Sequence, residues 1–343
     1  MPISCRLCRV QNSEPDFMTD SIKLLGISNA IVDVLSHVDD EFLARIGAPL
    51  GSMTLIDERR AHEIYELMGP STEMSGGSVA NTVAGFANLG GAAGYIGRVN
   101  DDQLGEIFVH DMRSLGVDIR LTPAPANSPT ARCHVLISED GQRTMQTYLG
   151  ACTELSVADV TSETVGSPAV ILLEGYVWDI AEGPALAAKA IEIAAANGSK
   201  VALSLSDSFC VERHREAFHD AVRNGVDIVV ADEDEVNALV QSDNFENTMK
   251  ILAGYDNLFA MTRSEKGSVI MHRGETVVQQ ASPVETIVDS TGAGDAYTAG
   301  FLYGWTQDFS LRKCAELGTY CATRVIQQVG GRIERGLLDD FLS

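Results

Sequence analysis

Short apolar runs alternate with helix-like segments along most of this chain, and that alternation constrains its fold more than any other feature. The apolar runs read as buried strands and lie at 22–27, 92–99, 169–177, 201–206, 226–232 and 258–263. The helix-like segments between them lie at 79–90, 101–116, 182–198, 215–225 and 246–255. Strands and helices in alternation form a mainly parallel sheet with helices on both faces. We therefore predict an α/β fold, a three-layer α/β/α sandwich.

Two regions interrupt the alternation with additional strand-like patches. These are residues 31–57 and 128–149, and the second contains an Asp-Gly turn signal. We predict that both regions form a small β-sheet that closes over the ligand site as a lid. The main domain is then expected to comprise 20–30, 58–127 and 150–343.

The charge and the cysteine content exclude several classes of protein. The 343 residues include 48 acids and 25 bases, a net charge of −23, which argues against nucleic acid or an anionic membrane surface as a partner. The seven cysteines are odd in number, a pattern typical of a reducing compartment rather than of a disulfide framework. We expect a cytoplasmic protein, a monomer or a homodimer, that acts on small molecules.

The first residues carry no recognisable targeting signal. Residues 1–19 contain no long apolar run of the kind that a signal peptide needs, so we expect a disordered extension. Met18 is a second candidate start, since MTDSIKLLGI leads directly into the first predicted strand.

The stretch DSTGAGDAYTAGFLYG, from Asp289 to Gly304, reads as a glycine turn that opens a helix. The residues before it, 285–289, read as the end of a strand. Gly292 and Gly294 allow the backbone to come close to a ligand. Because the first N–H groups of a helix have no internal partners and lie at the positive end of its dipole, the turn can bind an anion such as phosphate.

Asp295 lies just inside this helix, where a carboxylate beside a bound phosphate would be unfavourable. The position is useful if the carboxylate accepts a proton from an alcohol that attacks the phosphate. The simpler interpretation is a helix N-terminus, at which an acidic residue is favoured without any ligand. A second glycine cluster, SGGSVANTVAGFANLGG at 75–91, is also open to two interpretations, a helix start or a ligand cradle.

Together the two clusters resemble the two signatures of the ribokinase-like (PfkB) kinases. The resemblance runs from about Leu24 to Gly331 and is closest in DSTGAGDAYTAGFL. Within that family, the stretches 26–43 and 204–210 resemble the adenosine kinases. The chain has no Gly-Lys pair, so it contains no G-x-x-x-x-G-K-[ST] motif, and Tyr297 replaces the third glycine of G-x-G-x-x-G.

The resemblance implies transfer of the γ-phosphoryl group of ATP to a hydroxyl group. It implies that Asp295 accepts the proton and that Arg143 reaches the phosphates. The backbone expected to stabilise the transferring group is that of Gly292, Ala293 and Gly294. The implied sugar site is Asn29, Asp33, Gly76, Gly77, Ser78 and Asn81, in which Asp33 accepts from a vicinal diol. The implied nucleotide-binding residues are Thr262, Arg263, Ser264, Gly267, Gly292 and Gly294.

The family's N-x-x-E motif, which helps to organise magnesium, is altered in this chain. Asp232 takes the asparagine position and Glu235 the glutamate position in the run DEDE. These carboxylates could hold Mg²⁺ through water, because Mg²⁺ prefers hard oxygen ligands, or could form a solvated helix start. Several family members also bind a monovalent cation near the glycine turn, which makes Asp289 and Thr291 candidate ligands for K⁺.

The acceptor alcohol is left open by the residues themselves. The resemblance favours the 5′-hydroxyl of a ribonucleoside, most of all adenosine, which would give AMP. A free sugar such as ribose or fructose is the alternative within the same class. The alternative from another class is a ribokinase-like protein that binds a ligand and regulates a partner without catalysis. The intact glycine turn with Asp295 argues against that last alternative.

Overall fold

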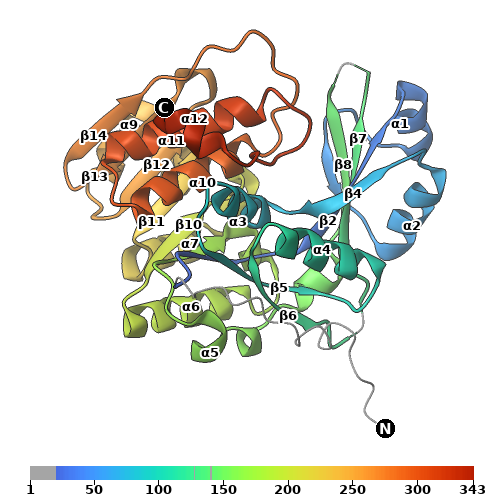
Figure 1. The fold of residues 1–343 in the computed structure, drawn as a ribbon, viewed down its shortest axis with the longest axis horizontal. Helices are drawn as coiled ribbons and strands as arrows, with labels where there is room; N and C mark the ends of the chain where they lie inside the picture. The colour runs from blue at the N-terminus through green and yellow to red at the C-terminus, as the bar shows by residue number, and fades with distance from the viewer. Residues whose placement is uncertain (1–20, 127, 140) are drawn as a thin grey trace.

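The computed structural model describes residues 21–126, 128–139 and 141–343. A nine-stranded sheet forms its centre, in the order β14-β13-β12-β11-β10-β9-β1-β5-β6 (Figure 1). Every pairing from β6 to β12 is parallel, and the last two strands add an antiparallel edge. In chain order the strands are β1 Leu24–Ile27, β5 Ala93–Val99, β6 Asp118–Pro123, β9 Val170–Glu174, β10 Lys200–Ser204, β11 Ile228–Asp232, β12 Leu258–Thr262, β13 Ser268–His272 and β14 Glu275–Gln279. The mainly parallel sheet is confirmed.

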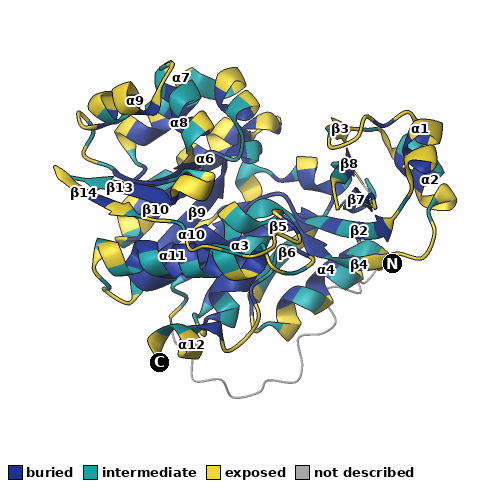
Figure 2. Cartoon of the chain, turned by 90° about the horizontal axis from the view of Figure 1, so that it is seen from above, coloured by how far each residue is buried: buried dark blue, intermediate teal, exposed yellow. Residues whose placement is uncertain are grey.

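Helices cover both faces of this sheet, and each face has its own hydrophobic cluster. One layer contains α3 Ser78–Asn88, α4 Gln103–Ser114, α10 Ala293–Thr306, α11 Leu311–Val325 and α12 Leu337–Leu342. The opposite layer contains α5 Ser162–Val165, α6 Gly183–Asn197, α7 Ser208–Asn224, α8 Glu233–Val240 and α9 Phe245–Leu252. The 3₁₀ turns are η2 Gly150–Glu154, η3 Val157–Asp159, η4 Gly175–Asp179 and η5 Ser264–Lys266. Figure 2 shows the buried sheet between helices that are exposed on their outer sides, so the three-layer prediction is confirmed.

A second sheet, here called the small sheet, stands beside the main body (Figure 1). Its strand order is β3-β8-β7-β2-β4. The strands are β2 Ile31–His37, β3 Met53–Leu55, β4 Thr72–Gly76, β7 Ala131–Ile137 and β8 Arg143–Tyr148. Helices α1 Asp40–Ile46 and α2 Glu58–Leu67 supply Phe42, Leu43 and Ile64 to a small core on one face of it. The strands predicted in 31–57 and 128–149 are thus present and form one sheet.

The boundary predicted for the main domain is wrong in one place. Residues 58–76 were assigned to the main domain, whereas α2 packs against β7 and β8, and β4 pairs antiparallel with β2. The sequence of β4 is TEMSG, which is short, polar and partly exposed, so it lacks the alternation that marks a strand. It becomes a strand because β2 offers it a free edge.

The strand end predicted at 285–289 is also wrong. The N–H groups of Val288 and Asp289 donate to the carbonyl of Ile326 at 2.8 and 3.3 Å, and the segment pairs with no described strand. Ile287 is 61% exposed, so its apolar side chain does not mark a buried strand.

Two further expectations lie outside the described residues. They are the extension over 1–19 and Asp140 of the predicted Asp-Gly turn. No helix of the described chain has both the length and the apolar character needed to span a membrane.

Candidate active site

The glycine turn opens helix α10, and its conformation leaves room for a ligand. Gly292 is the N-cap residue with φ of 73°, a left-handed conformation that favours glycine. A Cβ atom there would lie 2.5 Å from the Cα atom of Gly331, so no side chain fits. A Cβ atom on Gly294 would meet nothing within 4 Å, and no side chain of the described residues caps the helix. The first N–H groups, from Ala293 onward, therefore face a space that an anion can enter.

Asp295 joins the two glycine clusters of the sequence. Its Oδ1 atom accepts a hydrogen bond of 2.7 Å from Ser78 Oγ, and its Oδ2 atom accepts one of 3.2 Å from Asn81 Nδ2. Thr82 Oγ1 donates to its backbone carbonyl at 3.2 Å. Burial raises the pKa of Asp295 to about 6, although the two side-chain hydrogen bonds oppose this effect. The carboxylate is therefore ionised at neutral pH and still basic enough to accept a proton.

Asp33 lies on β2 of the small sheet, next to the second glycine cluster. Burial raises the pKa of Asp33 to about 6; the charges of Arg332 and Arg143 oppose the shift, and that of Asp295 adds to it. A Cβ atom on Gly76 would lie only 2.3 Å from the carboxylate of Asp33, so this position requires glycine.

Gly77 and Asn29 meet beside this carboxylate. Gly77 has φ of 94°, and a Cβ atom on it would lie 2.8 Å from the carbonyl oxygen of Asn29. The side-chain oxygen of Asn29 is buried and has no hydrogen-bond partner among the described residues. The residues predicted for the sugar site are thus gathered in one place.

Glu174 borders the candidate site, and the sequence interpretation did not single it out. It ends β9, is 1% exposed, and accepts a hydrogen bond of 3.1 Å from the backbone N–H of Asn29. Burial raises the pKa of Glu174 to about 7. The available signal was a single carboxylate at the end of the apolar run VILLE, at the edge of a parallel sheet where ligands bind.

Arg143 lies at the start of β8 and forms a buried ion pair with Asp289. The carboxylate of Asp289 also accepts from the N–H groups of Thr291, at 3.0 Å, and Gly330, at 2.9 Å. A guanidinium therefore already provides the positive charge that faces Asp289. K⁺ coordination by Asp289 and Thr291 stays a prediction, and a cation there would share the Asp289 carboxylate with this guanidinium.

Asp232 and Glu235 cap the start of α8 by bonding each other's backbone N–H groups. Glu235 N–H donates to Asp232 Oδ1 at 2.8 Å, and Asp232 N–H donates to Glu235 Oε2 at 2.9 Å. Burial and the neighbouring carboxylate raise the pKa of Glu235 to about 8, and burial raises that of Asp232 as well. Two carboxylates that repel one another fit a divalent cation such as Mg²⁺, which would neutralise both.

The segment predicted to meet the nucleotide lies beside these carboxylates. Thr262 is the register partner of Asp232 in the central sheet. Arg263 pairs with Glu233 at 2.8 Å and packs over the ring of Phe245, so its guanidinium is held at this edge. The turn that follows is tight, since Ser264 and Gly267 have φ of 49° and 84°.

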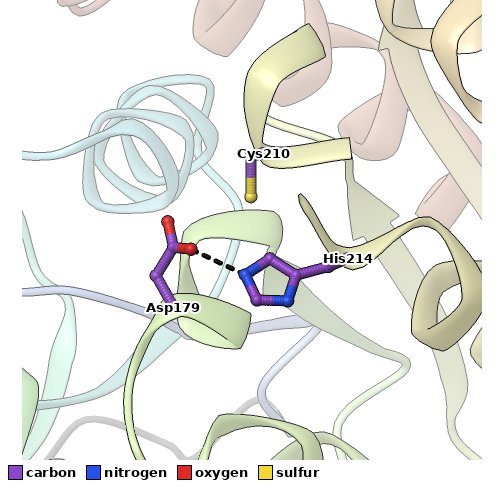
Figure 3. Close-up of side chains that lie close together, drawn as sticks. All are labelled: Asp179, Cys210 and His214. Atoms are coloured by element: carbon purple, nitrogen blue, oxygen red, sulfur yellow. Dashed lines mark hydrogen bonds and ion pairs between the residues drawn. The ribbon is translucent and has the colours of Figure 1, made fainter. Parts of the chain in front are cut away.

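Three further side chains, Asp179, Cys210 and His214, gather at the start of α7 (Figure 3). His214 Nε2 lies 2.6 Å from Asp179 Oδ1. Arg213 donates to both oxygens of Asp179, at 3.1 and 2.6 Å. Burial raises the pKa of the Cys210 thiol to about 12, which disfavours the thiolate that a metal requires. The group is therefore explained as an ion pair that ties η4 to α7.

Comparison with known proteins identifies the family. The model of the pfkB family carbohydrate kinases matches residues 55–335. The structure of adenosine kinase from Sinorhizobium meliloti is 45% identical, covers 94% of this chain and 98% of its own, and has a TM-score of 0.85. A probable sugar kinase from Rhizobium etli CFN 42 is 44% identical over 93% of this chain and 97% of its own, with a TM-score of 0.86. Adenosine kinase 2 of Arabidopsis thaliana is 24% identical over 90% of this chain and 94% of that relative.

These similarities extend over both sheets and both glycine clusters, and they confirm the ribokinase-like fold. Kinases of this kind use ATP as co-substrate and typically Mg²⁺. The chain belongs to the pfkB family of carbohydrate kinases, and it is an ATP-dependent kinase that acts on a hydroxyl group.

Proposed function

We propose that this kinase transfers the γ-phosphoryl group of ATP to the 5′-hydroxyl of a ribonucleoside, with adenosine as its preferred acceptor. The observation that carries the proposal is that two carboxylates meet the same glycine cluster. Asp33 on the small sheet lies against Gly76, and Asp295 at the glycine turn accepts a hydrogen bond from Ser78. The charge of Asp295 raises the pKa of Asp33, which indicates that the two lie within electrostatic reach of one another.

Asp33 is suited to hold a vicinal diol. An ionised carboxylate has two acceptor oxygens, and hydrogen bonds to it are stronger in an enclosed site than in water. The carboxylate packs directly against the backbone of Gly76, which holds it at the second glycine cluster. The 2′- and 3′-hydroxyls of a ribose would each donate to one oxygen.

Asp295 is suited to serve as the general base. The acceptor hydroxyl gives its proton to the carboxylate, and its oxygen forms a bond to the γ-phosphorus as the bond to the β–γ bridging oxygen breaks. ADP is the leaving group. The N–H groups at the start of α10, around Ala293 and Gly294, would stabilise the charge on the transferring group.

An apolar face surrounds Asp33 on the small sheet and suits a planar base. Side chains at alternate strand positions share a face, so Ile31 and Leu35 flank Asp33. Cys133 is the register partner of Asp33 on β7, and it belongs with Val135 to one hydrophobic cluster. Burial of a purine against this face is favourable, whereas a free sugar has less apolar surface to bury.

Phe209 offers a second contact for a base. It lies in the first turn of α7, beyond the C-terminal end of β10, and is 71% exposed. Ligands of open parallel sheets bind beyond these strand ends. An aromatic ring that exposed is suited to stack on a purine.

Asp232 and Glu235 are the proposed ligands, through water, of the Mg²⁺ that accompanies ATP. The metal supplies positive charge that balances the phosphates. Thr262, Ser264 and Gly267 would border the nucleotide on the same side of the sheet.

A free sugar is the second candidate acceptor. The relative from Rhizobium etli is described as a probable sugar kinase and is about as similar to this chain as the adenosine kinase from Sinorhizobium meliloti. Ribose also carries a diol, so Asp33 alone does not separate the two acceptors.

A coupled assay of ADP release separates them. We expect the highest kcat/KM with adenosine and a value at least about 10- to 100-fold lower with 2′-deoxyadenosine, because the missing hydroxyl leaves a buried acceptor unpaired. Ribose and fructose should be poorer still. Activity confined to free sugars, or equal kcat/KM for the two nucleosides, would reject the proposal. No ADP release with any acceptor would favour a binding role, and the Asp295→Asn protein controls for contaminating kinases.

A further inference from the structure

Arg332 lies in the loop after α11 and reaches back to the proposed sugar site. Its Nε–H donates to Asn81 Oδ1 at 3.3 Å. One of its terminal nitrogens donates to the carbonyl of Ser75 and, at 2.9 Å, to Ser75 Oγ. A single part-buried guanidinium thus contacts helix α3, which covers the central sheet, and strand β4, which belongs to the small sheet.

The contact with Asn81 determines which way its amide faces. The side-chain oxygen of Asn81 accepts a hydrogen bond from Arg332, and its side-chain nitrogen donates one to Asp295 Oδ2 at 3.2 Å. A rotated amide would place its N–H₂ group against the guanidinium and its oxygen against the carboxylate, and both contacts would be repulsive. The cation on one side and the anion on the other therefore favour the same orientation.

The two residues before Arg332 hold the turn from behind. Gly330 N–H donates to Asp289 Oδ2 at 2.9 Å. Gly331 packs closely against Gly292, since a Cβ atom on Gly292 would lie 2.5 Å from the Cα atom of Gly331. Three consecutive residues therefore contact the segment before the turn, the turn itself and the helix opposite it.

Arg332 also acts on Asp33 through charge. It lowers the pKa of Asp33, as Arg143 does, while Asp295 raises it and the Cys133 thiol faces it from β7. Arg332 is itself balanced by the charge of Asp111, which accepts from the Ser75 N–H at 2.9 Å.

We propose that Arg332 is a positioning residue of this kinase, which orients the Asn81 amide toward Asp295. This inference rests on the proposed role of Asp295 as general base. It assigns no contact between Arg332 and the substrate.

The test uses Arg332→Gln, Arg332→Lys and a matched control, Arg335→Gln. Arg335 makes the same type of contact on the same helix, with Nε–H donating to Asn88 Oδ1 at 3.3 Å, but it is exposed and far along α3 from Asn81. Carboxyl NMR titration of Asp295 in the full-length protein should show a pKa raised by about 0.5 to 1 in Arg332→Gln, because a misoriented amide no longer stabilises the ionised form. Arg335→Gln should match the wild type.

Turnover provides the second readout. Arg332→Gln should lower kcat about 10- to 100-fold, Arg332→Lys should lower it less, and Arg335→Gln should leave it within about twofold. In an Asn81→Ala background, Arg332→Gln should lower kcat by a clearly smaller factor than it does in the wild type, because the amide through which it acts on Asp295 is absent and only its charge effect on Asp33 is left.

An unchanged Asp295 pKa in Arg332→Gln, or equal losses of kcat in the presence and absence of Asn81, would overturn the inference. The titration of Asp295 needs no acceptor substrate. If the wild-type protein released no ADP with any acceptor, the proposed function would be rejected, but the titration would still test the positioning role of Arg332. If Arg332→Gln does not fold, Arg332→Lys carries both readouts.

Discussion

Asp295 combines two properties that usually exclude one another, a raised pKa and an ionised state at neutral pH. Burial disfavours the ionised carboxylate, and the hydrogen bonds from Ser78 and Asn81 stabilise it in part. The balance near pH 6 suits a general base, which must be free of its proton before the reaction and able to take one during it.

Asp295→Asn removes the proton acceptor and keeps the shape of the side chain. We expect kcat to fall by about two to four powers of ten. The free energy of unfolding at pH 8 should not fall, since a carboxyl whose pKa is raised in the folded state destabilises that state when ionised. Turnover is measured by ADP release and stability by denaturant unfolding. Turnover within tenfold of the wild type would contradict the assignment.

The pH dependence of kcat/KM should report two carboxylates. The pKa values of Asp33 and Asp295 are both raised to about 6, so both are protonated and inactive below that pH and ionised above it. Activity should therefore fall as pH decreases through about 6, with a limiting log slope near 2. Asp33→Asn should reduce the slope to about 1 while lowering the plateau. A slope of 1 in the wild type would show that only one of them titrates in this range.

At the scale of elements, the small sheet presents two unlike faces. Helices α1 and α2 cover one of them, and the other carries Asp33 among apolar side chains. Its ion pair with the main body, Arg143 to Asp289, joins β8 to the segment that precedes the glycine turn. An element whose open face can be covered by a ligand is suited to close over it.

We predict that nucleoside binding orders the small sheet. Amide hydrogen exchange should slow in 31–57 and 128–149 and also in β4, because β4 pairs with β2. Strand β10 is buried within the central sheet and serves as the internal control, with unchanged exchange. Equal exchange in the small sheet with and without nucleoside would rule out closure, and Arg143 would then have only its pairing role.

The sequence predicted the elements whose signals are local. Strands such as β9 and β11 are continuous apolar runs because helices cover both sides of them. The strand β4 escaped prediction because its pairing, and not its composition, makes it a strand. Both glycine clusters were recognised, since the turns need glycine for local steric reasons.

The contacts that complete the site could not be predicted in the same way. The pairing of Arg143 with Asp289 and the bonds of Arg332 join side chains with no common pattern in the sequence. Each contact pairs a charged or polar side chain with a partner on another element, and no spacing in the sequence predicts which elements will lie side by side.

At the scale of the whole molecule, the site is assembled from distant parts of the chain. Ser78 and Asp295 are 217 positions apart, and Ser75 and Arg332 are 257 apart. Loops of this length lose considerable entropy when they close, so such contacts form late in folding. Chains of this size commonly pass through compact intermediates. During refolding, the helical circular dichroism signal should therefore recover before ADP release does, and the molecule should spend part of its folding time as a compact chain that has helices and no enzyme activity.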